Sequence, residues 1–409
     1  MQLEPKEYLL PNNNIIYCFE SHTLPLVRLD FVFEAGPAYQ NKYLVAGMTN
    51  ALIATASRKH SSREVAEFMD FRGIVLDRDM DTFTSTLSVY FLKKYWKELI
   101  PLLKELFEEA EFHQDDFEVE RQKKRLQFQT SQQQTSNVAS KLFYQSVYGT
   151  DHILGKYASL EDYDKVTLED IKTFYKERYD WGNAKIIISG DFYESDMEYL
   201  PGIFGVRPGL VREKHKAATA VSMPCVKVTH TLQDFPGPQT TIRMGRIIPM
   251  KWDDIDLARF QILSVILGGY FGSRLMSNIR EDKGYTYGIY CRIRLVRDSV
   301  VFYITTDVGS QYVEDAIKEI NNELIRLCET LVDESELDVV KQVMSGNFLR
   351  SVDGIFECAE RFRTMSIANI TEQFRLNEEL ALNTITPQQL QNLAKLYLRP
   401  DMLTTVTVG

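Results

Sequence analysis

The chain has 409 residues, of which 44% are hydrophobic and 25% are charged, which is the composition of a globular protein with two or three domains. Its net charge of −10 argues against a general nucleic-acid binder, because such proteins need a basic surface to neutralise phosphates. No apolar run is long enough to span a bilayer, so we also expect no membrane contact.

The N-terminal segment and the cysteines indicate the compartment. Residues 1–20 lack a basic stretch followed by an apolar one, so we expect a cytoplasmic protein, although a signal peptide removed earlier would leave no trace in this sequence. The five cysteines are scattered and form no CxxC pair, which argues against a zinc knuckle and a disulfide framework. We expect five buried, reduced thiols, at Cys18, Cys225, Cys291, Cys328 and Cys358.

Hydrophobic periodicity predicts the elements of the first half of the chain. Apolar runs and alternating patterns indicate strands at residues 15–19, 27–34, 82–92 and 185–190. Apolar side chains at helical spacing indicate helices at residues 45–55, 62–72, 95–109, 115–128, 136–148 and 167–179.

The second half repeats this order. Strands are predicted at residues 239–246, 285–295, 300–306 and 403–408. Helices are predicted at residues 255–266, 274–281, 312–329, 334–353 and 386–397. The closing segments of the two halves align by eye, with Tyr179 opposite Tyr397. Two similar α+β domains are therefore predicted, each of ordinary domain size.

Residues 201–224 have the composition of a linker between these domains. Glycine and proline recur between Pro201 and Gly209, and a basic patch follows at residues 212–216, which is typical of an exposed connection. We therefore predict an N-terminal domain at residues 1–200 and a C-terminal domain at residues 225–409.

Candidate substrate-binding residues are concentrated in residues 267–291, which read LGGYFGSRLMSNIREDKGYTYGIYC. A pair of glycines, Gly268 and Gly269, precedes a short predicted helix that ends near Arg280, and Tyr287 lies on the strand that follows. A guanidinium group and a tyrosine hydroxyl can together hold a peptide carbonyl by hydrogen bonds. The alternative interpretation is an arginine in a surface ion pair and a tyrosine in the core.

This stretch resembles the C-terminal signature of the pitrilysin/insulinase-type metallopeptidases, the inverzincins, and especially their two-subunit, processing-peptidase-like subgroup. In that family an arginine and a tyrosine seven residues later grip the substrate near the scissile bond, and Arg280 and Tyr287 match both types and the spacing. Gly268, Gly269 and Phe271 are the accompanying positions expected to bind substrate.

The resemblance extends over roughly residues 15–408 and implies a fold. It implies an α+β chain of two homologous domains, each a largely antiparallel sheet packed with helices on one face, which together form half of a clamshell. In the two-subunit members one chain carries zinc, the other carries the arginine and the tyrosine, and the two close around an unfolded peptide.

The zinc-binding residues of the resembled family are absent here. The family carries His-x-x-Glu-His on a helix of the first domain, with a glutamate on a later helix as the last ligand. The alignment places Asn50 and Ala54 at the two histidine positions, Ile53 at the position of the general base, and Gln127 at the position of the last ligand. We therefore predict no metal in this chain, and zinc in a partner.

No other catalytic constellation is evident. The six histidines are far apart, and none has a partner at helical ligand spacing. His113 is followed by Asp115 and Asp116, a pattern more typical of a helix start than of a metal site. The G-x-S-x-G elbow and the G-x-x-x-x-G-K-[ST] loop are both missing.

One segment of the first domain differs from the resembled family. In active relatives an edge strand of the zinc domain pairs with the extended substrate. The corresponding residues 76–81 read LDRDMD, and three aspartates are unusual in such a strand. We expect a solvated loop at this position.

Together these patterns predict a non-catalytic, substrate-holding subunit of a heterodimeric zinc peptidase, inactive as a single chain. Its partner is expected to be a homologous chain that bears His-x-x-Glu-His, and its substrate an unfolded peptide. The alternatives are a structural scaffold and a peptide-binding protein of the same fold without a peptidase partner. An active homodimeric peptidase is disfavoured, because the zinc ligands are missing.

Overall fold

The computed structural model describes residues 4–205, 209, 223–232, 237–297, 299–368, 370 and 372–409. Contacts divide the described residues into two compact units. The first contains the described parts of Met1–Phe128, Ala158–His215 and Arg350–Ile367. The second contains those of Gln129–Tyr157, Lys216–Leu349 and Ala368–Gly409. Each unit is a largely antiparallel sheet packed with helices, so the predicted α+β fold is confirmed.

The sheet of the first unit has six strands in the order β1-β2-β6-β3-β5-β4, and only the β2–β6 pair is parallel. The strands are β1 (Lys6–Leu9), β2 (Ile15–Glu20), β3 (Leu26–Phe33), β4 (Val75–Met80), β5 (Ser85–Leu92) and β6 (Lys185–Gly190). Successive side chains of a strand point to opposite faces. Leu29, Phe31 and Phe33 of β3 therefore share one face, where Phe31 packs edge-on against Phe107 and Trp181.

Helices of the first unit cover this apolar face. Trp96, Leu99 and Leu103 of α3 are buried at helical spacing, because the apolar side chains of that helix form one stripe. The helical segments of the N-terminal half are η1 (Pro37–Tyr39), α1 (Val45–Leu52), α2 (Ser62–Arg72), η2 (Lys93–Tyr95), α3 (Trp96–Glu108), α4 (Gln114–Ser131), α5 (Thr135–Tyr148), η3 (Ile153–Gly155), α6 (Asp162–Lys165), α7 (Leu168–Arg178), α8 (Glu194–Met197) and α9 (Pro201–Phe204).

The sheet of the second unit has five strands in the order β7-β11-β8-β10-β9, and only the β7–β11 pair is parallel. The strands are β7 (Lys227–His230), β8 (Gln239–Ile248), β9 (Thr286–Val296), β10 (Ser299–Gly309) and β11 (Thr404–Val408). The helical segments of the C-terminal half are α10 (Ile255–Gly268), η4 (Met276–Asp282), η5 (Ser310–Tyr312), α11 (Val313–Glu329), α12 (Glu334–Arg350), α13 (Ile355–Ile367), α14 (Glu372–Thr384), α15 (Pro387–Tyr397) and η6 (Pro400–Met402).

The two halves of the chain follow a similar order of elements, with one more strand at the start of the first half. The closing helices α7 and α15 even begin with the same device, a capping box, in which Thr167 and Thr386 each accept a hydrogen bond from the backbone three residues later. The helices end at the C-caps Tyr179 and Leu398. In the repeat, Tyr179 is therefore equivalent to Leu398 and not to the predicted Tyr397, a difference of one residue.

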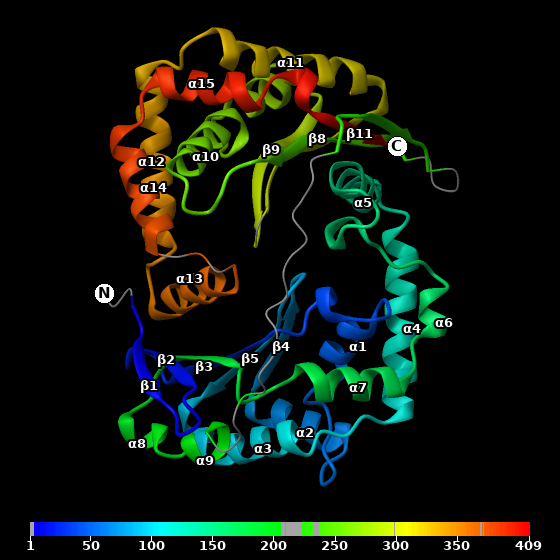
Figure 1. Cartoon of the computed structure of the whole chain (residues 1–409), viewed down its shortest axis with the longest axis vertical. Coiled ribbons are helices and arrows are strands. Elements are labelled where there is room, and N and C mark those ends of the chain that lie inside the picture. Colours follow the sequence, from blue (N-terminus) through cyan, green and yellow to red (C-terminus); the bar gives the residue numbers. More distant parts are fainter. Residues whose placement is uncertain are drawn as a thin grey trace. The chain divides into compact units, whose positions relative to one another are not determined.

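The first sheet carries a helix on its second face as well, an addition to the prediction of helices on one face. Phe362 of α13 packs against Tyr17 and Phe19 of β2, with ring centroids 4.7 and 5.7 Å apart. Glu360 of α13 accepts a hydrogen bond from Arg28 of β3, which faces away from the apolar core of the unit. Figure 1 shows α13 and α3 on opposite faces of this sheet.

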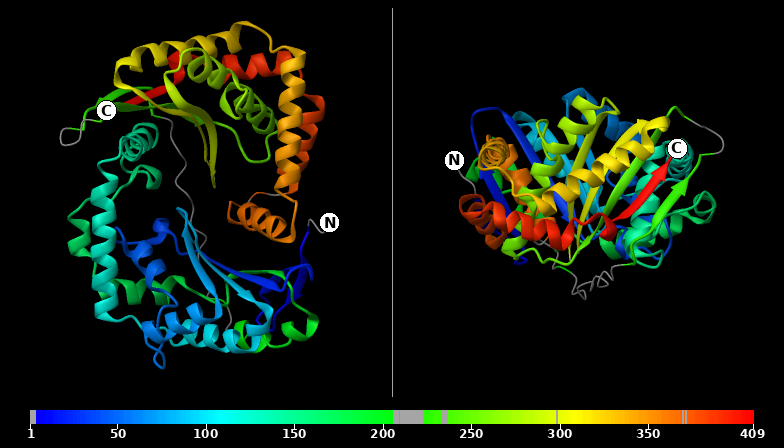
Figure 2. Two further views of the ribbon diagram at one scale, coloured as in Figure 1. Left: turned by 180° about the vertical axis from the view of Figure 1, so that it is seen from behind. Right: turned by 90° about the horizontal axis from the view of Figure 1, so that it is seen from above.

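The second sheet has the equivalent arrangement with α5. Ile247 and Val301 are directly opposite each other on β8 and β10 and pack against α5, whose Phe143 and Val147 are buried. The other face of the sheet packs against α10 and α11. Figure 2 (left) shows α5 and α11 on opposite sides of the strands.

Helices α5 and α13, which cover the second faces of the two sheets, each come from the half of the chain that forms most of the other unit. Residues 129–157 fall within the predicted N-terminal domain but belong to the second unit, and residues 350–367 fall within the predicted C-terminal domain but belong to the first. The predicted linker, residues 201–224, lies largely outside the described residues, and its beginning is the short helix α9.

The expectation of a loop at residues 76–81 is wrong, because β4 is an edge strand paired antiparallel with β5. Asp77 and Asp79 point to solvent, while Arg78 between them is half-buried. Asp81 closes the turn to β5 by accepting hydrogen bonds from the backbone of Phe83 and Thr84. The strand tolerates three aspartates because two lie on its exposed side and the third caps a turn.

None of the described helices combines the length and the apolar composition that crossing a bilayer requires.

Candidate functional site

A π-helical turn presents Arg280. The segment η4 has π-helical geometry, and the N–H of Lys283 donates to the carbonyl of Asn278, five residues earlier. Gly284, with a φ of +65°, ends the turn in the left-handed region that glycine adopts without strain. Ile279 on the inner side is fully buried, so Arg280 lies on the outer side and is half-buried.

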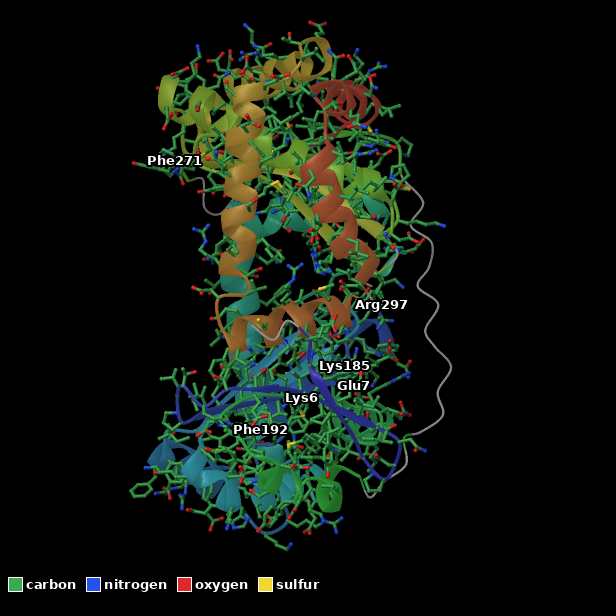
Figure 3. The ribbon with its side chains drawn as sticks, turned by 90° about the vertical axis from the view of Figure 1, so that its left-hand side faces the viewer. Lys6, Glu7, Lys185, Phe192, Phe271 and Arg297 are labelled. Atoms are coloured by element: carbon green, nitrogen blue, oxygen red, sulfur yellow. The ribbon has the colours of Figure 1, made fainter. Side chains whose placement is uncertain are left out.

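The guanidinium group of Arg280 packs against an exposed aromatic ring. Its central carbon lies 4.6 Å from the centroid of the Phe271 ring, within the range of a cation–π contact. The side chain of Phe271 is 61% exposed and projects outward in Figure 3. Arg280 makes no ion pair or side-chain hydrogen bond with any described residue, so its five N–H donors are available to a ligand.

A β-bulge exposes Tyr287. Val308 of β10 pairs with Thr286 of β9, and Thr306 pairs with Ile289, so residues 287 and 288 together face a single residue of β10. The extra residue reverses the alternation of side chains. Without it Tyr287 would lie on the same face as the buried Ile289, whereas with it the tyrosine is 90% exposed.

Neither part of the alternative interpretation matches these positions. Among the described residues Arg280 forms no surface ion pair, and Tyr287 is outside the core. The turn at Lys283 and Gly284 lies between the two residues along the chain. Among the described residues, the Tyr287 hydroxyl and the Arg280 guanidinium therefore have no hydrogen-bond partner, and one turn of the chain lies between them.

The two glycines of the candidate site serve the packing of the helix before it. A Cβ atom at Gly268 would lie 2.7 Å from the sulfur and 2.9 Å from the backbone nitrogen of Cys291. Only glycine therefore lets the end of α10 approach β9 this closely. Gly269 is the C-cap of the same helix, and a Cβ there would collide with Val265. Of the three predicted accompanying positions, only Phe271 is exposed at the surface beside Arg280.

The positions aligned with the zinc ligands do not fit a metal. The buried side chain of Asn50 accepts a hydrogen bond from Ser85 at 2.7 Å and donates one to the carbonyl of Asp79 at 3.2 Å. Helix α1 ends at Leu52, and Ala54 lies beyond it with a φ of +56°. Two ligands four residues apart need one continuous helix to face the same ion, so positions 50 and 54 cannot share one here.

Other groups occupy the surroundings of these positions. The Oγ of Ser85 lies 2.8 Å from the hydroxyl of Tyr179, which extends the hydrogen-bonded chain from Asn50. Burial raises the pKa of the Tyr179 hydroxyl, so this group stays neutral. Gln127, aligned with the last ligand, is exposed on α4. Within the described part of the chain no three His, Cys, Asp or Glu side chains are grouped as a metal site.

Comparison with known proteins finds a related family. Residues 165–344 match the family model described as "Peptidase M16 inactive domain". This part of the chain is similar to the peptidase M16 inactive domain. The predicted resemblance to the pitrilysin/insulinase-type metallopeptidases, the M16 peptidases, is therefore confirmed, and both Arg280 and Tyr287 lie inside the matched residues.

Relatives of the M16 domain extend the similarity over most of the chain. The chain is 24% identical over 338 residues to the "Non-peptidase homolog YmxG" of Helicobacter pylori, covering 80% of this chain and 76% of that protein. It is 21% identical over 360 residues to an "Uncharacterized zinc protease" of Rickettsia felis, covering 85% and 83%. A crystal structure described as a peptidase M16 inactive domain from Pseudomonas fluorescens has the same fold, with a TM-score of 0.85 and 22% identity over 99% and 98% of the two chains.

Two features of these residues were not predicted from the sequence. Arg78 of β4 donates hydrogen bonds to the carbonyl of Ile53 at the end of α1, and nothing local in the sequence links these positions. Arg292 and Arg294 lie on the exposed face of β9. Their signal was present as an alternating R-I-R pattern, which places both arginines on one face of a strand.

Proposed function

We propose that this chain is a non-catalytic, substrate-holding subunit of a two-chain zinc peptidase. The partner is a homologous chain that bears His-x-x-Glu-His, and Arg280 and Tyr287 complete its active site. The shared substrate is an unfolded peptide. The proposal is supported by the match to an inactive M16 domain and by the amide and apolar side chains at the aligned zinc positions.

One observation carries the proposal. The bulge in β9 gives Tyr287 an exposure of 90%, while the π-helical turn leaves the guanidinium group of Arg280 without an ion pair among the described residues. Both features have a structural cost, because a bulge interrupts the ladder and a π-helical turn is rare. A chain that served only as a scaffold would gain nothing from either.

The chemistry of the two side chains suits the holding of a peptide. A tyrosine hydroxyl and a guanidinium group can both donate hydrogen bonds to a carbonyl oxygen. Fixing the carbonyl next to a reactive centre lowers the entropic part of the barrier. The partner's zinc would supply the activated water, whereas this chain would supply position and hydrogen bonds to the developing negative charge.

Capture of the partner from native cells tests the proposal. The tagged chain is purified gently, and the co-purifying chains are identified by mass spectrometry. We expect a chain of similar size bearing His-x-x-Glu-His in equal amount, and chelator-sensitive peptide hydrolysis only in the mixed complex. Chelator-sensitive hydrolysis by this chain alone would contradict the proposal.

A peptide-binding role without a peptidase partner is the second candidate. It is favoured by the relative named "Non-peptidase homolog YmxG", which is 24% identical. Arg280 and Tyr287 would then hold a peptide without cutting it. Recovery of the chain without a zinc-bearing partner, together with measurable peptide binding, would favour this role. Recovery without either would favour a structural scaffold.

A further inference from the structure

The second unit has a cluster of arginines on the face of its sheet opposite α10 and α11. We call it the arginine face, and it consists of Arg243, Arg292 and Arg294 with the rings of Tyr290 and Tyr303. Thr305 pairs with both Arg243 and Tyr290, and Tyr303 pairs with Arg292, so these side chains lie in adjacent rows of one face.

The arginines are held in place by aromatic and hydroxyl groups and not by acids. Arg243 donates to the Oγ of Ser140 at 2.6 Å and lies 4.5 Å from the ring centroid of Tyr303. Arg294 donates to the hydroxyl of Tyr144 at 3.2 Å. These contacts orient the guanidinium groups without neutralising their charge.

The charge of the arginine face is uncompensated within the described residues. None of its three arginines forms an ion pair there, and the buried Nε of Arg243 has no hydrogen-bond acceptor. Asp307 is the carboxylate in the adjacent row, and it accepts a hydrogen bond from Thr241. A concentration of unpaired positive charge is unusual in a chain whose net charge is −10.

The arginine face is continuous with the candidate site. The bulge that exposes Tyr287 also moves its side chain to the face that carries Tyr290, Arg292 and Arg294. The ring of Tyr290 folds back over Gly288, where a Cβ atom would lie 2.5 Å from the tyrosine hydroxyl. Along β9, Tyr287 and Arg292 are separated by about 17 Å at the rise of an extended strand.

We infer that the arginine face binds acidic side chains of the same extended peptide whose backbone Arg280 and Tyr287 hold. This inference rests on the proposed function and names its substrate class, a peptide with Asp or Glu several residues from the held carbonyl. Arg292 and Arg294 are two residues apart, so their spacing matches that of alternate side chains in an extended peptide.

An acidic peptide fits better than a nucleic acid. Nucleic-acid binding needs a wide basic surface, whereas the net charge of this chain repels a long polyanion. A few carboxylates on a peptide experience mainly the local field of the arginines, because at physiological salt charges beyond about 8 Å are screened.

The test compares the binding of fluorescent peptides by anisotropy. The peptides alternate glycine with glutamate, glutamine or lysine, and a single-stranded DNA of matched charge is included. The variants are Arg292→Gln/Arg294→Gln on the arginine face and Arg326→Gln/Arg399→Gln as a control with the same change of charge. Arg326 and Arg399 lie elsewhere in the second unit, and both are largely exposed.

We expect the glutamate peptide to bind at least about fivefold more tightly than the glutamine peptide, and this preference to disappear only in the Arg292→Gln/Arg294→Gln variant. Equal binding of the two peptides, or equal loss in the control variant, would overturn the inference. Binding of the DNA as tight as that of the glutamate peptide would overturn the choice of a peptide.

A further variant separates this inference from the proposed function. Tyr287→Phe is expected to weaken the glutamate and glutamine peptides by the same factor, because it removes a hydrogen bond to the backbone. If Tyr287→Phe leaves the binding of both peptides unchanged while the preference for glutamate persists, Tyr287 does not hold the peptide backbone, but the arginine face does bind acidic side chains. If Tyr287→Phe weakens the binding of both peptides and neither peptide is preferred, Tyr287 holds the backbone, but the arginine face does not bind acidic side chains.

Discussion

Arg78 donates two hydrogen bonds to the carbonyl oxygen of Ile53, from Nε at 3.2 Å and from Nη2 at 2.9 Å. Ile53 is the C-cap of α1, so the guanidinium group lies where the helix dipole is negative. Burial lowers the pKa of Arg78 below its ordinary value, yet an arginine at this site remains charged at neutral pH. The positively charged side chain of Arg78 thus stabilises the C-terminal end of α1, next to Ala54, which is aligned with a zinc-binding histidine.

Restoring the missing ligands is therefore expected to be insufficient for zinc binding. In the variant Asn50→His/Ala54→His/Gln127→Glu, position 54 stays beyond the helix end, and its side chain cannot join that of position 50 on one ion. After dialysis against zinc, metal analysis is expected to find less than one bound ion per chain. A stoichiometric ion in a variant with wild-type circular dichroism would show that the backbone adapts.

Tyr287→Phe is expected to lower turnover of the assembled peptidase by about tenfold or more, because one donor to the developing oxyanion is lost. Its hydroxyl has no structural partner among the described residues, so assembly and thermal stability are expected to remain unchanged. Tyr199→Phe, a tyrosine 53% exposed in the first unit, is the control. Wild-type turnover of the Tyr287→Phe complex would remove this residue from the site.

Two glycine substitutions are expected to have opposite effects on the free energy of unfolding. Gly268→Ala places a methyl group against the backbone of Cys291, and such overpacking costs about 1–3 kcal/mol. Gly346→Ala in α12 meets nothing within 4 Å and removes a helix-interior glycine, which gains about 0.5–1 kcal/mol. Urea denaturation measures both. A harmless Gly268→Ala would mean that α10 moves away from β9 without cost.

The docking of α13 is expected to weaken in acid. Burial acts to raise the pKa of Glu360, but hydrogen bonds and charge from Arg363 and Arg28 outweigh it, so the pKa lies below its ordinary value of 4.5. A carboxyl group with a depressed pKa contributes stability above its unfolded-state pKa and loses it as the pH falls through the folded-state pKa. The protection of α13 amides against hydrogen exchange, measured relative to the intrinsic exchange rate at each pH, should therefore fall below about pH 4.5.

Glu360→Gln supplies the comparison for this pH dependence. At neutral pH the variant should exchange faster in α13 than the wild type, and the difference should shrink as the pH falls below the ordinary carboxyl pKa. A difference that stays constant across this range would assign the docking to Phe362 and its aromatic contacts alone.

The thiols are expected to differ sharply in reactivity. Cys225 is exposed, which corrects the expectation of five buried thiols, whereas the other four cysteines are buried. Burial raises the pKa of Cys18 to about 12 and that of Cys291 further, so these thiols stay protonated and unreactive. A thiol reagent should rapidly modify one thiol in the native protein and five thiols after denaturation. In the native Cys225→Ser variant it should modify no thiol rapidly. Fast modification of several native thiols would contradict the packing.

Much of the fold is encoded in local patterns that sequence reasoning can recognise. Alternation and helical spacing depend on neighbours a few residues apart, so β3, α3 and α11 follow directly from their apolar stripes. The repeat, the family resemblance and the replacement of the zinc ligands by Asn50, Ala54 and Gln127 are likewise properties of the sequence itself.

The tertiary structure decided what depends on distant partners. Helix α1 was expected to continue to residue 55, but it ends at Leu52, where Arg78 of a later strand binds its last carbonyl. The assignment of α13 to the first unit depends on contacts such as that of Glu360 with Arg28, which local periodicity does not contain. Tyr287 could be found from sequence, but its exposure depends on a bulge, which exists only when β9 pairs with β10.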